Sequence, residues 1–157
     1  MQTTLVNSEL AVTYPDSFHI MDAKEQLEVY VDDNPCRWCI KDGAERSMVS
    51  VIWHDAGKLV VRLTSTKSLA KRAESQSRRI YRGYSYALGG FFSRHVGGEE
   101  AEGFRFEYTL DGEVFIGQTI VAKHGSCCYT IYWYAPKTDD KKALTDFEDI
   151  LGALDFV

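Results

Sequence analysis

Cys36 and Cys39 are the pair of side chains whose type and spacing could most readily do chemistry. Two cysteines separated by two residues can chelate zinc or cycle between a dithiol and a disulfide. A structural zinc site needs four protein ligands, and the other cysteines, Cys127 and Cys128, are neighbours that point to opposite faces of a strand. The segment also lacks the βαβ context of thioredoxin-like motifs. We therefore expect reduced thiols and no cofactor, with a thiol- or metal-dependent function of Cys36 and Cys39 as the alternative.

The histidines form no recognisable catalytic or metal-binding pattern. His19, His54, His95 and His124 are dispersed, without H-x-x-x-H or H-E-x-x-H spacing. His54 precedes Asp55 and could act as a base with an orienting carboxylate, but adjacent residues at a turn are more simply explained by solvation. A G-x-S-x-G nucleophile motif and a lysine-containing phosphate loop are also missing from the sequence. We expect no enzymatic activity.

The charge of residues 65–84 is more distinctive. This segment holds six basic residues and one acidic residue, a net charge of +5 within a chain whose total is −5. At about 100° per residue, four of its cations fall within an arc of about 60° opposite an apolar stripe of the expected helix. These four residues are Lys67, Lys71, Arg78 and Arg82.

Two interpretations of this basic arc are open. It is either the solvated face of an amphipathic helix or a docking surface for an acidic protein partner, which would associate more slowly at high salt. Residues 138–157 contain six acids and two lysines, so this protein carries a complementary acidic segment of its own. Self-association into a homo-oligomer is therefore a further expectation to test.

Hydrophobic periodicity predicts the elements that must position these residues. In the first half of the chain, apolar residues alternate in short segments that predict strands over residues 10–14, 27–31, 36–40 and 48–53. Residues 58–63 are either another strand or the approach to a helix.

A helix is predicted over residues 66–83. Its apolar stripe consists of residues that recur at spacings of four, seven and four, namely Leu69, Ala73, Ile80 and Tyr84. Thr64, Ser65 or Thr66 can supply the N-cap oxygen, and Gly83 is well placed to end the helix.

From Gly103 onwards the apolar period changes to two. Strands are predicted over residues 104–110, 114–123 and 127–135, with a further strand over residues 91–96. Asp111-Gly112 favours a type I′ turn, in which both central residues have positive φ. Strands joined by such short turns are antiparallel neighbours.

The last of these strands is rich in aromatic residues. Tyr129, Ile131 and Trp133 share one of its faces, and Tyr132 and Tyr134 share the other. We expect all of them in the core if both sheet faces are covered. An open face would instead make Tyr132 and Tyr134 part of a groove or a dimer contact.

A second helix closes the chain. Thr138 is expected to cap it, and Asp139 and Asp140 would lie at the positive end of its dipole. Its apolar stripe consists of Leu144, Phe147, Leu151 and Leu154. Short strands, a helix, an antiparallel meander and a final helix predict an α+β domain in which both helices pack on a sheet.

The order of several short motifs resembles the PsbP/Mog-type fold superfamily. They are Tyr14-Pro15-Asp16 followed by Phe18, Ser50-Val51-Ile52, the basic helix, Val96-Gly97-Gly98, Gly103-Phe104-Arg105, and Phe147 with Ile150, Leu151 and Phe156. The resemblance covers residues 8–157 and implies an antiparallel sheet with helices packed on both sides, an α/β/α sandwich. The superfamily includes an extrinsic photosystem II subunit, a Ran-binding nuclear import factor and many bacterial domains of unknown function. The resemblance thus implies binding or assembly rather than catalysis.

The composition agrees with one globular domain over residues 1–157. A chain of 157 residues with 45% hydrophobic residues is long enough to bury a core without disulfides or metals. Its net charge of −5 argues against a general nucleic-acid binder. No run approaches the ~20 apolar residues of a membrane helix, and residues 1–20 show no signal-peptide pattern. We expect no membrane partner and a cytoplasmic location.

These observations predict a non-enzymatic protein-binding or assembly module. The first alternative is the thiol- or metal-dependent function of Cys36 and Cys39. The second is a carrier of a small ligand or peptide in a groove between the sheet and a helix.

Overall fold

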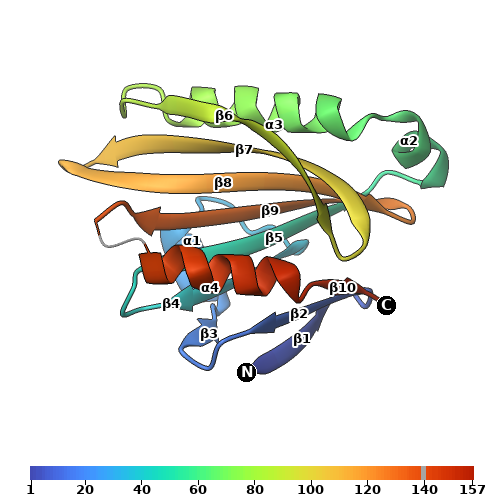
Figure 1. The fold of residues 1–157 in the computed structure, drawn as a ribbon, viewed down its shortest axis with the longest axis horizontal. Helices are drawn as coiled ribbons and strands as arrows, with labels where there is room; N and C mark the ends of the chain where they lie inside the picture. The colour runs from blue at the N-terminus through green and yellow to red at the C-terminus, as the bar shows by residue number, and fades with distance from the viewer. Residues whose placement is uncertain (139–140) are drawn as a thin grey trace.

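The computed structural model describes residues 1–138 and 141–157. Its centre is a seven-stranded antiparallel sheet with the strand order β3-β4-β5-β9-β8-β7-β6 (Figure 1). The strands are β3 (Phe18–Ile20), β4 (Arg37–Asp42), β5 (Ser47–Asp55), β6 (Ala87–Val96), β7 (Glu99–Leu110), β8 (Glu113–His124) and β9 (Cys127–Pro136). A smaller antiparallel sheet contains β1 (Gln2–Val6), β2 (Leu10–Tyr14) and β10 (Asp155–Phe156) in the order β1-β2-β10.

The antiparallel meander predicted from the sequence is confirmed, because β6, β7, β8 and β9 pair consecutively. Asp111 and Gly112 connect β7 to β8 with φ values of 51° and 78°. Gly97 and Gly98 connect β6 to β7 with φ values of 58° and 84°. Positive φ at both central residues is the geometry of a type I′ turn, whose twist matches that of the flanking strands.

The strand predicted over residues 27–31 is wrong, because this part of the chain begins within helix α1 (Ala23–Val29). Asp22 starts the helix with a capping box. Its carboxylate accepts a hydrogen bond from the Glu25 backbone N–H at 2.8 Å, and the Glu25 side chain accepts one from the Asp22 backbone N–H at 3.3 Å. Leu27 and Val29 are exposed, so their alternation reflects no buried sheet face.

The helix predicted over residues 66–83 is confirmed as α3 (Thr66–Ile80), which ends three residues earlier than predicted. Ser65 caps it by accepting a hydrogen bond from the Ser68 backbone N–H at 3.0 Å. The predicted apolar stripe is wrong in its second half, since Ile80 is 69% exposed. Small side chains form most of the buried face and let the helix lie close to the sheet: they are Ala70, Ala73 and Ser77.

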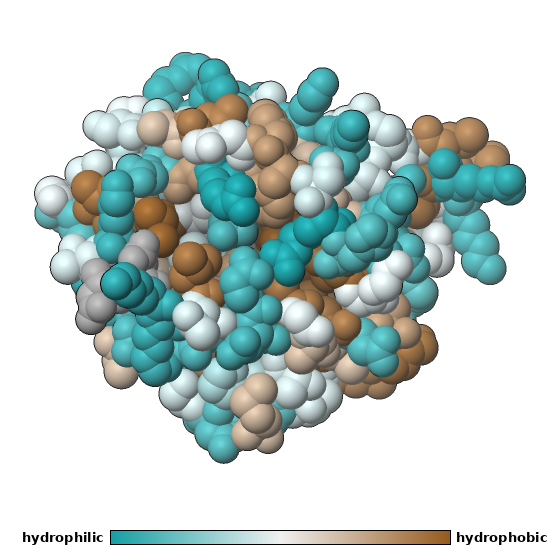
Figure 2. All heavy atoms as spheres, viewed as in Figure 1, coloured by the Kyte–Doolittle hydropathy of each residue, from teal (hydrophilic) through white to brown (hydrophobic). Residues whose placement is uncertain are grey.

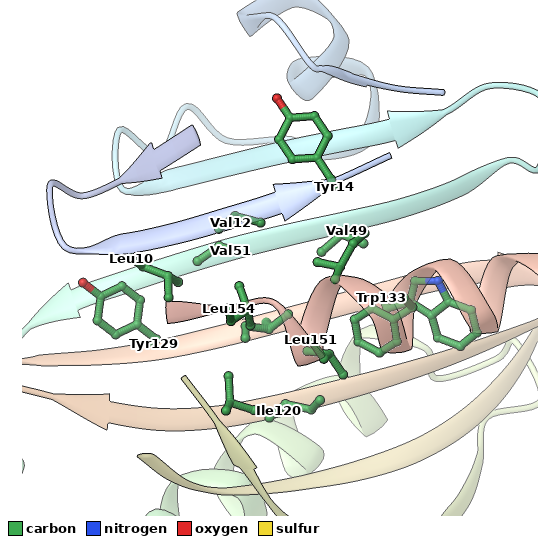
Figure 3. Close-up of a cluster of buried hydrophobic side chains, with 14 of the residues drawn as sticks. Leu10, Val12, Tyr14, Val49, Val51, Ile120, Tyr129, Trp133, Leu151 and Leu154 are labelled. Atoms are coloured by element: carbon green, nitrogen blue, oxygen red, sulfur yellow. The ribbon is translucent and has the colours of Figure 1, made fainter. Parts of the chain in front are cut away.

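Two hydrophobic clusters make up the core. The larger one joins the small sheet and α4 (Lys141–Gly152) to the large sheet (Figure 3). Its largest side chain, Trp133, stacks on Phe147 with the ring centroids 5.0 Å apart. The smaller cluster lies beneath α3 and contains Phe104, Phe106 and Val121. Together these contacts give an α+β fold, as predicted.

The apolar stripe predicted for the final helix is confirmed at three positions, since Phe147, Leu151 and Leu154 are buried. Asp139 and Asp140, which were predicted to interact with the helix dipole, lie outside the described residues. The predicted cap at Thr138 precedes them, and the described part of the helix begins at Lys141. Across the described segments, no helix is long and apolar enough to cross a membrane.

Candidate functional site

Helix α2 (Lys58–Leu63) projects from one end of the large sheet (Figure 1). Gly57 begins it in a left-handed conformation, with φ at 84°. Val61 is the buried residue of the helix. Lys123, near the end of β8, donates hydrogen bonds from Nζ to the carbonyl oxygens of Val61 and Thr64 at 3.0 and 2.5 Å. A cation at the C-terminal carbonyls satisfies groups that a helix end leaves free, so α2 is tied to the sheet.

The outer surface of α2 is apolar. Leu59, Val60 and Leu63 are 68%, 53% and 77% exposed. Figure 2 shows hydrophobic side chains gathered at the same projecting end of the molecule that α2 occupies in Figure 1. Burying such a side chain contributes about 1.5–3 kcal/mol, so three of them on one short helix are a substantial unused binding capacity.

Cations flank this apolar helix. Lys58 and Arg62 belong to α2, and Lys67 and Lys71 belong to the first two turns of α3. Residues 58–82 contain eight basic residues and one acidic residue, a net charge of +7. We call the apolar residues Leu59, Val60 and Leu63 together with Lys58, Arg62, Lys67 and Lys71 the α2–α3 surface.

All four cations of the predicted basic arc are exposed, but they differ in whether they form an ion pair. Arg78 forms an ion pair with Glu74, four residues earlier in α3, and this hydrogen-bonded contact raises the pKa of Arg78. In the described part of the chain, Lys67, Lys71 and Arg82 form no ion pair. Within the described residues, the predicted arc therefore contains three cations without an ion pair and one, Arg78, that is paired with Glu74.

The position of the arc differs from the prediction. Glu74 lies about 20° from Lys67 when α3 is viewed along its axis, and Glu74 is buried. The arc thus borders the buried face of α3 instead of lying opposite to it. The expected stripe included Ile80, which is exposed, and omitted Ala70 and Ser77, which are buried.

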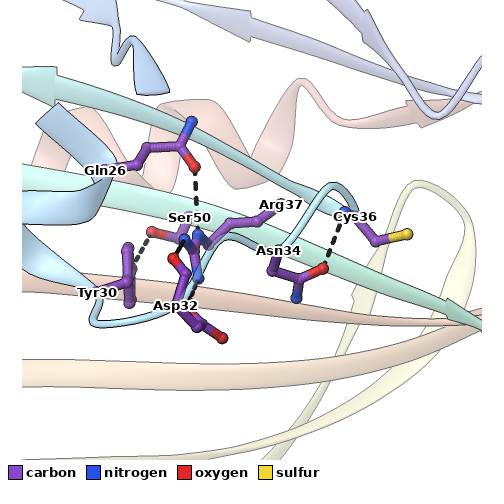
Figure 4. Close-up of polar contacts among 7 residues, drawn as sticks. All are labelled: Gln26, Tyr30, Asp32, Asn34, Cys36, Arg37 and Ser50. Carbon is purple, nitrogen blue, oxygen red and sulfur yellow. Dashed lines mark hydrogen bonds and ion pairs between the residues drawn. The ribbon is translucent and has the colours of Figure 1, made fainter. Parts of the chain in front are cut away.

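Cys36 and Cys39 are not brought into a common site. Cys39 lies in β4 and is fully buried, whereas Cys36 lies in the turn before β4 and is partly exposed, with its backbone N–H donating to Asn34 at 2.9 Å (Figure 4). Burial raises the pKa of the Cys39 thiol, which lowers its reactivity. Among the described residues, no group of three or more His, Cys, Asp or Glu side chains is placed to hold a metal.

Polar contacts occupy the surroundings of Cys39. Arg37 shares its face of β4, and the Arg37 guanidinium donates to Asp32 at 2.7 Å and to Gln26 at 3.2 Å (Figure 4). Tyr30 lies beneath this guanidinium, 4.0 Å from ring centroid to Cζ. These contacts hold β4 against α1 and the loop that follows it, which gives the segment a structural role.

Tyr132 and Tyr134 pack on the face of β9 expected for them. Tyr134 contacts Phe106 of the smaller cluster with the centroids 6.3 Å apart, and Tyr132 stacks on Tyr134 at 6.4 Å. Burial raises the pKa of Tyr134 well above its usual value. Tyr132 and Tyr134 are half-buried, and Tyr134 packs against the smaller cluster, so the core interpretation holds only in part.

The exposed apolar surface of α2 was not predicted from the sequence. Its residues were expected to form a strand or the approach to a helix, because four apolar residues among six are typical of a buried segment. The signal that could have found it is the pair Lys58 and Arg62, four residues apart, which is helical spacing for two exposed cations.

No family model and no curated protein matches this sequence. Solved structures do. The solution structure of CyanoP, the cyanobacterial PsbP from Synechocystis sp. PCC 6803, has a TM-score of 0.73 at 14% identity and covers 99% of this chain and 92% of that chain. A Bacteroides thetaiotaomicron VPI-5482 protein has a TM-score of 0.61 at 11% identity, over 99% of this chain and 48% of that chain.

LpqN of Mycobacterium tuberculosis, described as involved in cell envelope biogenesis, has a TM-score of 0.57 at 10% identity and covers 94% of this chain and 83% of that chain. At such identities, structural similarity bears on the fold alone. The Mog-type part of the expected resemblance stays a prediction. The chain has a PsbP-like fold.

Proposed function

We propose that this protein is a non-enzymatic binding or assembly module that docks an acidic protein partner on its α2–α3 surface. The observation that carries the proposal is the exposure of Leu59, Val60 and Leu63 on a helix that Lys123 holds in place. Large apolar side chains on a fixed element lose little conformational freedom when they bind, so they favour affinity.

The cations define the partner. Lys67 and Lys71 have no intramolecular ion pair within the described residues, so their charge is available to an acidic surface. Such charges mainly raise the association rate and select against basic partners, and their effect weakens as salt increases. The partner that fits is a protein with an apolar pocket rimmed by carboxylates.

Self-association through the acidic segment at residues 138–157 is the second candidate. It has less support than the number of acids suggests, because some of these carboxylates already form ion pairs. Glu148 is paired with Arg94 at 3.1 Å, and Asp146 is paired with Lys142 at 2.6 Å. Both carboxylates thus already have cationic neighbours. We therefore favour a separate protein partner, whose carboxylates would pair with the free cations of α3.

The thiol- or metal-dependent alternative has less support. Such a function would need Cys36 and Cys39 to act together, and the structure places one in a turn and the other in a buried strand position. We therefore retain binding as the proposed function and test the thiols separately.

We also propose that helices cover both faces of the large sheet, in the α/β/α sandwich that the resemblance implies. Ile120 and Val121 follow each other in β8 and so point to opposite faces. Ile120 packs in the cluster that contains α4, and Val121 packs in the cluster beneath α3. An experimental structure tests this arrangement.

The binding proposal is tested with two double variants. Leu59→Ser/Leu63→Ser removes the apolar contacts, and Lys67→Glu/Lys71→Glu reverses the free charges. The matched controls are Leu27→Ser/Val29→Ser on the exposed side of α1 and Lys24→Glu/Lys141→Glu, which changes the net charge equally. Tagged proteins are used to capture partners, and the identified partner is then purified and titrated against each variant.

We expect both α2–α3 variants to weaken binding to the purified partner by at least tenfold, with the wild-type association rate falling as salt rises. The control variants should bind as the wild type does. Equal binding by all five proteins, or equal loss in the controls, would contradict the proposal. Circular dichroism of each variant separates loss of binding from loss of folding.

A further inference from the structure

We propose that the hollow between α4 and the β6–β9 part of the large sheet binds a small carboxylate with an apolar body and one N–H or O–H donor. The hollow has a volume of about 450 Å³. That lies within the range of about 300–1,000 Å³ typical of small-ligand sites. The residues that carry the inference are Arg105, Glu107, Ile116, Gln118, Trp133 and Leu144.

Gln118 is the polar group at the base of the hollow. It lies in β8 between Arg105 of β7 and Trp133 of β9, and it is 5% exposed. Its Oε1 atom is buried and has no hydrogen-bond partner among the described residues. A buried acceptor without a donor destabilises the protein, and nearly all such groups in folded proteins are satisfied. When the Gln118 amide turns into the hollow, a ligand with an N–H or O–H at this point supplies the missing donor.

Arg105 is the cation at the rim of the hollow. Its guanidinium lies over the ring of Phe92, with Cζ 4.2 Å from the ring centroid, so the aromatic face supports it from one side. It forms no ion pair within residues 1–138 and 141–157. The nearby carboxylate of Glu107 is paired with Lys137 at 2.8 Å, which leaves the charge of Arg105 available. A planar guanidinium binds carboxylates through two parallel hydrogen bonds.

The remaining walls are apolar. Ile116 and Leu144 face the hollow from β8 and α4. Trp133, which is 1% exposed, lies at the edge of the hollow, and its indole N–H donates to Ser47 Oγ at 3.0 Å, so this side of the hollow has no unsatisfied indole donor. A cationic rim, a buried acceptor and apolar walls together select an amphipathic carboxylate over a sugar, a metal ion or a polyanion.

The site is separate from the α2–α3 surface. It opens on the side of the sheet where Ile120 and α4 pack, and none of its lining residues belongs to α2 or α3. The inference therefore goes beyond docking of a protein and does not depend on it.

Indole-3-acetate is the probe, because it combines a carboxylate, an apolar ring system and one N–H. Naphthalene-1-acetate has a similar body and the same carboxylate but no donor. Isothermal titration and amide chemical-shift mapping measure the binding of each acid to the full chain. We expect indole-3-acetate to bind at least tenfold more tightly than naphthalene-1-acetate, because a site with a buried acceptor discriminates against an analogue without the donor.

Variants assign the contacts. Gln118→Leu should remove the preference for the indole, and the exposed substitution Arg105→Gln should weaken both acids about tenfold. Arg79→Gln, an exposed arginine of α3, is the matched control and should change nothing. If Gln118→Leu fails to fold, Gln118→Met replaces it, and Arg105→Gln still tests the carboxylate contact.

Equal affinity for the two acids, a preference that survives in Gln118→Leu, or no binding of either acid would overturn the inference. Shift changes confined to residues away from β7, β8 and α4 would do the same. Leu59→Ser/Leu63→Ser should bind indole-3-acetate normally, so failure of the docking proposal and failure of this one are distinguishable.

Discussion

Arg78 and Glu74 form an ion pair in which the base is exposed and the acid is buried. The side chain of Arg78 is 62% exposed, whereas that of Glu74 is 7% exposed. Arg78 donates from Nε and Nη2 to the two carboxylate oxygens of Glu74. One cation of the basic arc thus stabilises α3 itself, and Lys67 and Lys71 remain for a partner.

Removing either member of this pair should destabilise the fold. Glu74→Gln should lower the free energy of unfolding by about 1–2 kcal/mol, because hydrogen bonds to charged groups contribute about 1.5–3 kcal/mol and the amide retains part of that. Arg78→Gln leaves a buried carboxylate without its cationic partner and should also destabilise the protein. Urea denaturation of both variants and the double variant gives the coupling energy. Arg79→Gln is the control, and a coupling near zero would contradict the pairing.

Stability at acid pH should depend on Asp32. The Arg37 guanidinium holds the pKa of Asp32 below its usual value of 3.8. The unfolded chain therefore binds more protons than the folded chain near this pH, so the contribution of Asp32 is present above about pH 4 and is lost as pH falls through the lowered pKa. Asp32→Asn should be less stable than the wild type at pH 6, and the difference should shrink towards pH 2.

Urea denaturation at several pH values measures this difference. The neighbouring substitution Asp33→Asn is the control and should follow the wild type throughout. A difference between Asp32→Asn and the wild type that stays constant from pH 6 to pH 2 would show that the ion pair is not the cause.

The two cysteines of the C-x-x-C segment should differ in reactivity. Cys36 is partly exposed and should react with a thiol reagent in the folded protein at pH 8. Cys39 is buried with a raised pKa and should react only after unfolding. Cys36→Ser should change stability by less than about 0.5 kcal/mol, and Cys39→Ser by about 1 kcal/mol or more.

Mass spectrometry of protein purified without reductant tests the alternative function directly. Bound zinc in the native mass, or a Cys36–Cys39 disulfide in the denatured mass, would replace the structural interpretation of the segment with a chemical one. We expect four free thiols and no metal.

Substitution by alanine should destabilise the protein at Gly103 but not at Gly43. A Cβ atom on Gly103 would lie 2.6 Å from the Thr119 carbonyl oxygen and 2.7 Å from Cζ of Phe92. Gly103→Ala should therefore destabilise the protein by about 1–3 kcal/mol, the usual cost of overpacking. Gly43 has no atom within 4 Å of its added Cβ, so Gly43→Ala is the matched control. Thermal unfolding that ranks the two variants the other way would refute the close packing of β7 on β8.

The parts of the fold that were predictable are those where local chemistry and tertiary packing agree. Asp111-Gly112 favours a type I′ turn in any chain, and the alternation of Phe104 and Phe106 with polar residues reports a buried sheet face directly. The α3 helix was predictable from its cap and periodicity. Its buried stripe was not, because small residues such as Ala70 and Ser77 carry little hydrophobic signal.

The candidate site was only half predictable. Lys67 and Lys71 were found from charge and helical spacing alone. Exposure of Leu59 and Leu63 was not, because a sequence records that a residue is apolar but not whether another element covers it. The sequence also could not show that Arg105 lacks an ion-pair partner among the described residues, because this depends on which carboxylates the fold brings near it. The nearby Glu107 pairs with Lys137.

The pairing of β2 with β10 bears on how the chain folds during synthesis. Ala11 lies opposite Asp155 in the small sheet, and the ring of Phe156 contacts those of His124 and Tyr129. Contacts between such distant parts of a sequence slow folding, since the intervening chain must be ordered first. The larger cluster is incomplete until residues 155–156 have been synthesised and can pair with β2, so we expect Leu10 and Val12 of a nascent chain to stay accessible to chaperones until then.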